Sequence, residues 1–208
     1  MNIVNYLKET YGYAVPIFLK DIRIGRKSKV AIRKELSRAV QNGDIVRKSQ
    51  GVYCLEDDTD IPKTASFEDV VEKKFIKDDY GLPGLNIDVY GYYSGLTFQH
   101  QIGLTQQVPA VLEITTNNTS CKRFYRCDGY RAIVKKGKEQ IDRLNYKAFQ
   151  LFDCINNLDG EEIIKNKEIL YKYIEKNITK TDFEKYSHIL TTKSFKYLTE
   201  SGLLYAFR

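Results

Sequence analysis

The sequence lacks the features on which several protein classes depend. It has no run of about 20 apolar residues, the length that a helix needs to cross a bilayer. Its N-terminus, MNIVNYLKET, has no basic stretch followed by an apolar one, as a signal peptide would have. Its four cysteines form no CxxC pair, and the spacing from Cys121 to Cys127 matches no common zinc pattern. We therefore expect a cytoplasmic protein with reduced thiols, no metal, no cofactor and no membrane partner.

Signatures of catalysis are equally scarce. His100 and His188 are the only histidines, no Ser or Cys stands in a nucleophile elbow, and no Gly-rich phosphate loop is present. We therefore expect no enzyme. The one constellation that suggests chemistry is Asp88 with Glu113, because divalent-metal nucleases place one acid before a strand and another along it. Those nucleases have Lys two residues further on, where this chain has Thr115, so we expect a structural or degenerate site.

Positive charge is concentrated at one end of the chain. Residues 1–50 contain 11 Lys and Arg against 4 Asp and Glu, a surplus of seven, whereas the whole chain of 208 residues is +6. Residues 51–208 therefore sum to −1. A small region with a large basic surplus is the electrostatic pattern expected of a module that binds nucleic acid.

The sequence of this basic region, GRKSKVAIRKELSRAVQNGDIVRKSQGVYCL over residues 25–55, predicts a helix and a hairpin. Ser28 is a plausible N-cap for a helix from about 29 to 42, and Gly43 suits the left-handed position that ends it. Strands are predicted at 44–48 and 52–55. A first helix over 3–11 and a second beginning near Pro16 would complete a winged helix-turn-helix unit.

In a winged helix the third helix enters the major groove, and the hairpin tip meets phosphates. We expect Arg33 and Ser37 to read base edges, and Arg26, Lys27, Lys29 and Lys48 to contact the backbone. The full set of predicted DNA-binding residues is Arg26, Lys27, Ser28, Lys29, Arg33, Lys34, Ser37, Arg38, Arg47 and Lys48.

The remainder predicts a second domain, so that the domains span 1–58 and 66–208 with an acidic linker at 56–62. Its expected elements are a helix over 67–80, a helix from Ser94 or Thr97 to Ile102, a strand over 111–116, strands over 123–127 and 130–135, and helices near 144–155, 163–178, 183–190 and 195–204. The predicted fold class is α+β: an N-terminal winged helix-turn-helix followed by a mixed α/β domain with a helical C-terminal part.

A second stretch, YYSGLTFQHQIGLTQQVPAVLEITTNN over residues 92–118, together with the segment that ends GDIVRKSQGVYCL, resembles the AbiEi-type antitoxins of type IV toxin–antitoxin (abortive infection) systems. The resemblance implies an autorepressor that binds inverted repeats in double-stranded DNA at its own operator. It also implies a second domain that counters a nucleotidyltransferase-like toxin without a stable complex. Two alternatives stay open: a divalent-metal nuclease targeted by the winged helix, and a transcriptional regulator that senses a ligand.

Overall fold

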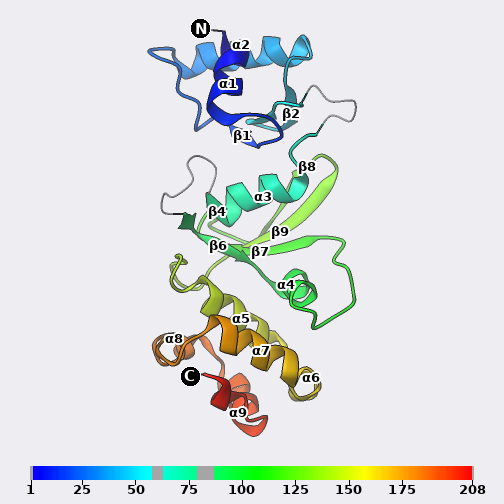
Figure 1. The fold of residues 1–208 in the computed structure, drawn as a ribbon, viewed down its shortest axis with the longest axis vertical. Helices are drawn as coiled ribbons and strands as arrows, with labels where there is room; N and C mark the ends of the chain where they lie inside the picture. The colour runs from blue at the N-terminus through cyan, green and yellow to red at the C-terminus, as the bar shows by residue number, and fades with distance from the viewer. Residues whose placement is uncertain (1, 58–62, 79–86, 208) are drawn as a thin grey trace. The chain divides into compact units, whose positions relative to one another are not determined.

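The structure is a computed structural model that describes residues 2–57, 63–78 and 87–207. It has mixed α+β architecture, which confirms this part of the predicted class (Figure 1), and the winged helix-turn-helix stays a prediction. The chain divides into two compact units, each described here by itself. The N-terminal unit contains Met1–Lys74, Asp78–Asn86 and Arg126–Tyr130, and the C-terminal unit contains Phe75–Lys77, Ile87–Tyr125 and Arg131–Arg208. The predicted linker falls largely on residues 58–62, outside the described residues.

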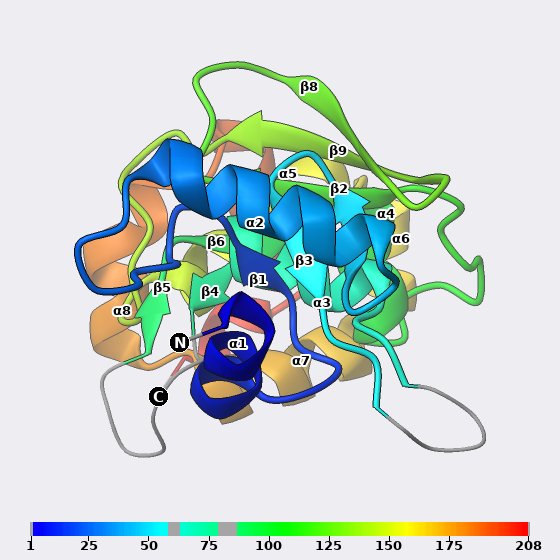
Figure 2. The ribbon, with the colours of Figure 1, turned by 90° about the horizontal axis from the view of Figure 1, so that it is seen from above.

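Two helices and three short strands make up most of the N-terminal unit. They are α1 (Ile3–Tyr11), β1 (Ile17–Phe18), α2 (Lys29–Gln41), β2 (Val46–Ser49) and β3 (Val52–Cys54), and α3 (Phe67–Phe75) begins in the same unit. The strands pair in the antiparallel order β1-β3-β2. Figure 2 shows α1 and α2 running in crossing directions next to these strands. Ile3, Leu7, Ile32 and Leu36 pack the two helices into one core.

Both ends of α2 form as the sequence predicts. The Ser28 hydroxyl accepts a hydrogen bond from the Ala31 amide at 3.2 Å, which satisfies one of the free donors of the first turn. At the other end Gly43 has φ +79°. The Gly43 amide donates to the Val40 carbonyl at 3.1 Å, and the Asp44 amide to the Ala39 carbonyl at 2.9 Å. This is the Schellman arrangement, and it turns the chain sharply into the hairpin.

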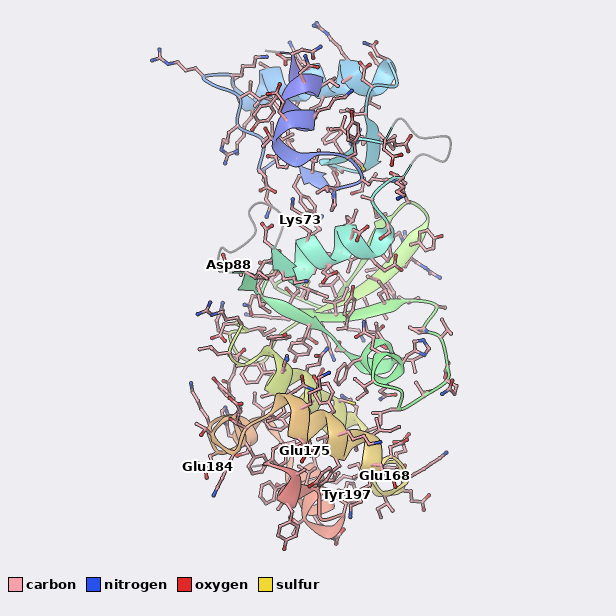
Figure 3. All side chains as sticks on the ribbon, viewed as in Figure 1. Lys73, Asp88, Glu168, Glu175, Glu184 and Tyr197 are labelled. Atoms are coloured by element: carbon pink, nitrogen blue, oxygen red, sulfur yellow. The ribbon has the colours of Figure 1, made fainter. Side chains whose placement is uncertain are left out.

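The second helix predicted from Pro16 is wrong. Ile17 and Phe18 instead form β1, which pairs with Tyr53 and Val52 of β3, and both side chains are buried. Two turns then lead to α2, so that the described chain has two helices before the hairpin rather than three. Pairing with a strand far along the chain outweighs the local helical pattern. Lys73 of α3, labelled in Figure 3, donates to the Pro16 carbonyl at 3.0 Å and helps to fix this segment.

A four-stranded sheet organises the first part of the C-terminal unit. Its order is β6-β7-β9-β8, formed by β6 (Gly91–Tyr93), β7 (Leu112–Thr116), β9 (Tyr130–Lys136) and β8 (Arg123–Cys127). β6 pairs antiparallel with β7, and β7 pairs parallel with β9. The strands predicted over 111–116, 123–127 and 130–135 are thereby confirmed. Two short strands, β4 (Lys77–Asp78) and β5 (Asp88–Val89), pair separately.

The predicted helix after Ser94 is α4 (Gly95–Gln101), with Ser94 at its N-cap position and Gly103 beyond its end at φ +81°. The predicted helix at 67–80 is shorter, because α3 ends at Phe75. The residues from 79 to 80 lie outside the described residues. No helix of the described ranges is both long and apolar enough to cross a membrane.

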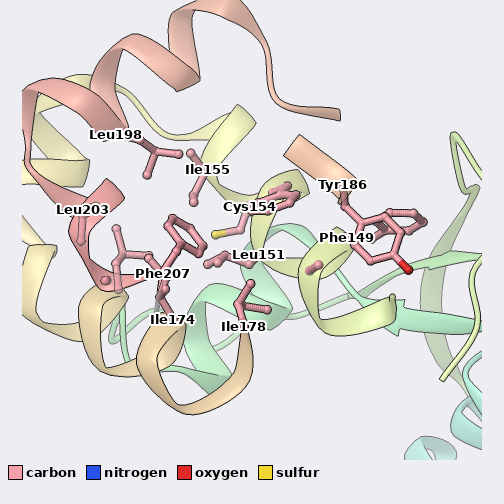
Figure 4. Close-up of a cluster of buried hydrophobic side chains, with 14 of the residues drawn as sticks. Phe149, Leu151, Cys154, Ile155, Ile174, Ile178, Tyr186, Leu198, Leu203 and Phe207 are labelled. Carbon is pink, nitrogen blue, oxygen red and sulfur yellow. The ribbon is translucent and has the colours of Figure 1, made fainter. Parts of the chain in front are cut away.

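Helices make up the end of the C-terminal unit. They are α5 (Tyr146–Asn157), α6 (Gly160–Lys165), α7 (Lys167–Asn177), α8 (Lys180–Tyr186), η1 (Ser187–Ile189), α9 (Thr192–Glu200) and η2 (Leu203–Ala206). Leu151, Ile155, Ile174, Leu198 and Phe207, drawn in Figure 4, belong to their common core. The helix predicted over 163–178 is divided at Asn166, whose backbone leaves the helical region. Leu144 is 69% exposed, because α5 begins after it and the residue never joins the buried face.

Candidate nucleic-acid interface

The candidate interface is the face of α2 that points away from the core. Ile32, Leu36 and Ala39 are buried on the opposite face. A helix of this length is about 20 Å long. The exposed side chains along it are Lys29, Val30, Arg33, Lys34, Ser37, Arg38 and Gln41. The five residues predicted for the helix itself, Lys29, Arg33, Lys34, Ser37 and Arg38, therefore share one accessible surface.

Cations on this face repel one another. Lys29 and Arg33 are four residues apart, as are Lys34 and Arg38, and like charges at this spacing destabilise a helix by a few tenths of a kcal/mol. Within the described residues none of these four forms an ion pair. The single acid of the helix, Glu35, binds Lys27 at 2.7 Å. The charge of the exposed face is thus not neutralised by acids among the described residues.

The N-terminal end of α2 also carries an excess of positive charge. The N-terminus of a helix carries partial positive charge, which acidic residues in the first turn usually offset. α2 has no acidic residue there, and its first residue is Lys29. Arg26, exposed in the turn before the helix, brings a further cation to this end. An anion such as a phosphate would be favoured here by charge and by the free amides of the first turn.

Of the two predicted residues in the hairpin, Arg47 is exposed and Lys48 is not. Arg47 is exposed on β2. Lys48 instead lies in a bulge, because Arg47 pairs with Tyr53 and Ser49 with Val52, and Lys48 is left over. The side chain of Lys48 is 8% exposed, and its ammonium binds the Asp128 carboxylate at 3.0 Å. The expectation that Lys48 contacts phosphate from the hairpin tip is therefore corrected.

Two predicted residues have intramolecular roles, and two suitable residues were missed. The Ser28 hydroxyl caps α2, and Lys27 holds Glu35. Val30 is 60% exposed. It lies on the same strip of the outward face as Gln41, at the opposite end of the helix. An exposed valine among cations can contact a thymine methyl group, and glutamine can bind adenine at two points. Plotting α2 on a helical wheel from the sequence could have placed both residues on this face.

The acidic constellation that suggested a nuclease has a structural role at Glu113. Its carboxylate accepts a hydrogen bond from the Leu96 amide at 3.3 Å and fills the space beside Gly95, where a Cβ would clash with it. Its own amide donates to the Thr97 hydroxyl at 2.9 Å. Glu113 therefore fastens α4 to β7. Asp88 is exposed on β5 (Figure 3), and the described residues contain no group of three or more possible metal ligands.

The same contacts join two parts of the segment 92–118, the Ser-Gly-Leu turn and the strand that contains Glu113. Gly95 has φ +54°, a conformation that side chains disfavour, and Glu113 occupies the room that its missing Cβ leaves. The Ser94 amide also donates to the Glu113 carbonyl at 2.8 Å. The Ser-Gly-Leu turn and the Glu of the following strand are thus one structural unit.

In comparisons with known proteins, no family model matches the chain and no curated protein matches it significantly.

Proposed function

We propose that the protein binds double-stranded DNA through the exposed face of α2. The observation that carries this proposal is the set of four cations, Lys29, Arg33, Lys34 and Arg38, which face solvent without ion-pair partners in the described chain. Repulsion within α2 is relieved when phosphates approach, because each contact neutralises a cation and releases counterions from the DNA. A polyanion is thus the partner that this surface favours most.

The dimensions of α2 suit the major groove. That groove is about 12 Å wide and accepts an α-helix. With α2 in the groove, Ser37 and Gln41 lie on the central strip of the outward face and can meet base edges, and Arg33 flanks them. Arg26 and Lys29 at the start of the helix then reach the phosphate backbone, as does Arg47 from the hairpin.

Affinity measured against salt concentration tests this proposal. The logarithm of the association constant falls by about 0.9 per neutralised phosphate for each logarithm of salt, so four contacts give a slope of roughly −4. Lys34→Gln is expected to reduce that slope by about 1 and to weaken binding to all sequences alike. Lys172→Gln, the same charge change at an exposed lysine of α7, is the matched control and should leave the slope unchanged. Equal effects of the two variants would contradict the proposal.

Sequence preference is tested by a different residue. Arg33→Ala is expected to cost about 1–3 kcal/mol at the preferred site and to reduce the difference between the preferred and a scrambled duplex. The duplex is taken from upstream of the protein's own gene, and an inverted repeat within it is the expected site. If Arg33→Ala weakened both duplexes equally, this residue would contact phosphates only.

The broader role that we propose is that of an antitoxin and autorepressor of a type IV toxin–antitoxin operon. Its support is the resemblance of residues 92–118, whose Ser94, Gly95 and Glu113 form one contact unit in β6, α4 and β7. The test is co-expression with the product of the adjacent gene, which should be nucleotidyltransferase-like. Growth should be rescued without a stable complex on co-purification. Growth arrest that persists despite expression of this protein would contradict the role.

A further inference from the structure

A cavity of about 140 Å³ lies in the C-terminal unit, between the sheet and α5. Its floor is a row of three side chains on adjacent strands. Tyr92 of β6 stands opposite Thr115 of β7, and Thr115 is in register with Lys135 of β9. Residues in register share one face of a sheet, so these three side chains face the cavity together. Phe149 and Asp153 of α5 line it as well.

The floor contains a hydroxyl without a well-formed hydrogen bond. Thr115 is 3% exposed, and its Oγ1 atom makes no hydrogen bond of good geometry among the described residues, although the Tyr92 hydroxyl is near enough to interact with it. A buried polar atom left in this state costs free energy, and nearly all such atoms in native proteins are satisfied. The hydroxyl faces the cavity, so a group that enters from solvent could complete its hydrogen bonding.

The surroundings of Thr115 are polar on one side. Lys135 Nζ binds Asp153 Oδ2 at 3.0 Å, and the Lys135 side chain is 32% exposed. Burial raises the pKa of Tyr92 above its ordinary value, the Asp153 carboxylate raises it further, and a hydrogen-bonding interaction with the Thr115 side chain lowers it in part. Tyr92 is therefore a neutral hydroxyl at physiological pH and can donate a hydrogen bond. Three donors, from Tyr92, Thr115 and Lys135, thus converge on the floor.

The mouth of the cavity is positively charged. Lys136 and Lys138 line it, and neither forms an ion pair in the ranges that the structure describes. The acid at the mouth, Glu139, is bound by His188 Nε2 at 2.6 Å. The remaining wall is apolar and consists of Ile141, Phe149 and Ile189. A ligand that suits this lining has an anionic head and a small apolar body.

We propose that this cavity binds a small organic anion, a carboxylate or phosphate ester with a compact body. The anionic oxygens accept hydrogen bonds from Thr115 and Tyr92 and neutralise Lys138 at the mouth, while the body packs against Phe149. The size excludes larger ligands, because pockets for drug-sized molecules have volumes of about 300–1,000 Å³. The site is independent of DNA binding and gives the C-terminal unit a ligand of its own.

Titration of the full chain with inorganic phosphate, acetate and benzoate at constant ionic strength, with chloride as the reference, tests the proposal. The readout is the residue-resolved amide spectrum, which separates this cavity from the cations of α2. We expect saturable shifts at Thr115, Gly137 and Lys138. Stronger binding of benzoate than of acetate is expected if the apolar wall contributes. Comparison of phosphate with the carboxylates identifies the head group.

Two variants make the test decisive. Thr115→Val keeps the shape and removes a hydroxyl that makes no well-formed hydrogen bond, so the protein should fold, and Lys138→Gln removes a surface charge. Loss of one hydrogen bond to an anion weakens binding about tenfold or more, and we expect this in both variants. The matched controls are Lys122→Gln, exposed in the same unit and outside the cavity, and Lys34→Gln of α2. Unchanged affinity in Thr115→Val, or no saturable shift with any of the three anions, would overturn the proposal and leave only water in the cavity.

Discussion

Three helices of the C-terminal unit differ from α2 of the N-terminal unit in the charge at their N-termini. α6, α7 and α8 each have an acid in the first turn and a lysine in the last turn. Capping boxes close α6 and α8, in which Asp159 pairs with Glu162 and Thr179 with Asp182. α2 is capped by Ser28 alone and begins with Lys29. Acids of the helix itself therefore offset the N-terminal dipole in α6, α7 and α8, and none does so in α2.

This difference separates residues that stabilise the fold from residues that are available for binding. Acids near a helix N-terminus contribute about 0.3–1 kcal/mol each, and like-charged neighbours oppose helix formation. α2 has no acid near its N-terminus, and its like-charged neighbours oppose helix formation. Glu35 shows that an acid can be accommodated elsewhere in this helix. An anion bound to α2 would supply the negative charge that the sequence does not place near the helix N-terminus. The comparison thus predicts that substitutions in the two units have effects of opposite sign.

The largest effect is expected in the aromatic core of the C-terminal unit. Phe152 is fully buried, and its ring lies 6.1 Å from that of Phe183 and 6.4 Å from that of Phe207. Phe152→Ala should lower the free energy of unfolding by about 3–5 kcal/mol, because it leaves a cavity. Urea unfolding followed by circular dichroism measures it. Phe124→Ala, at a residue that is 61% exposed, is the control and should change stability by less than about 0.5 kcal/mol. Similar losses in both variants would show that Phe152 does not anchor this core.

The second effect is a loss of stability at high pH that belongs to the C-terminal unit. Burial raises the pKa of Cys154 to about 12, and the Asp153 and Glu162 carboxylates add to this. The unfolded chain releases the thiol proton near its ordinary pKa and the folded chain keeps it, so the Cys154 contribution is complete at neutral pH. It declines as pH rises above about 9, by about 1 kcal/mol at pH 10.

Chemical unfolding at several pH values measures this contribution. Cys154→Ala should make the decline between pH 8 and pH 10 shallower, and Cys121→Ala, which removes an exposed thiol, should not change it. The same burial predicts that Cys121 is alkylated rapidly in the native protein and Cys154 slowly. Rapid native alkylation of Cys154 would contradict the environment described here.

Local signals account for the parts of the fold that the sequence predicts well. The cap at Ser28 and the left-handed Gly43 each depend on residues within a few positions of one another. β1 was missed because its partner β3 lies more than thirty residues away, and nothing near Pro16 reveals that pairing. Nonlocal pairing of this kind regularly overrides local preference.

The same distinction applies to the candidate sites. The exposed cations of α2 follow from helical periodicity, so that the five predicted residues of the helix, half of the predicted set, are found on one face. The prediction for Lys48 was wrong because this residue lies in a bulge, and because Asp128, far along the chain, binds its side chain. The cavity floor of Tyr92, Thr115 and Lys135 depends on the register of three strands, one of them parallel. Composition and spacing do not determine that register.

The third effect compares the two kinds of cap. Asp159→Ala should lower stability by about 1–2 kcal/mol, since it removes a charged cap and the reciprocal bond of Glu162. Ser28→Ala should cost about 1 kcal/mol, because a single neutral bond to the Ala31 amide is lost. Thermal unfolding at low salt measures both. Asp159→Asn, which keeps a capping acceptor without the charge, is the control and should fall between Asp159→Ala and the parent. A greater loss for Ser28→Ala than for Asp159→Ala would invert the comparison.

The smallest effect distinguishes the units most sharply. Lys29→Glu should raise the stability of α2 by about 0.3–1 kcal/mol, because it places an acid at the helix N-terminus and removes repulsion from Arg33. The same substitution should lower DNA affinity and reduce its salt dependence. Lys29→Gln is the intermediate control, with a smaller gain in stability and a smaller loss of binding. In the C-terminal unit the reverse change, Glu161→Lys in the first turn of α6, should destabilise by a similar amount. If Lys29→Glu lowered stability instead, the cations of α2 would be serving the fold, and the contrast between the two units would not reflect a division between stability and binding.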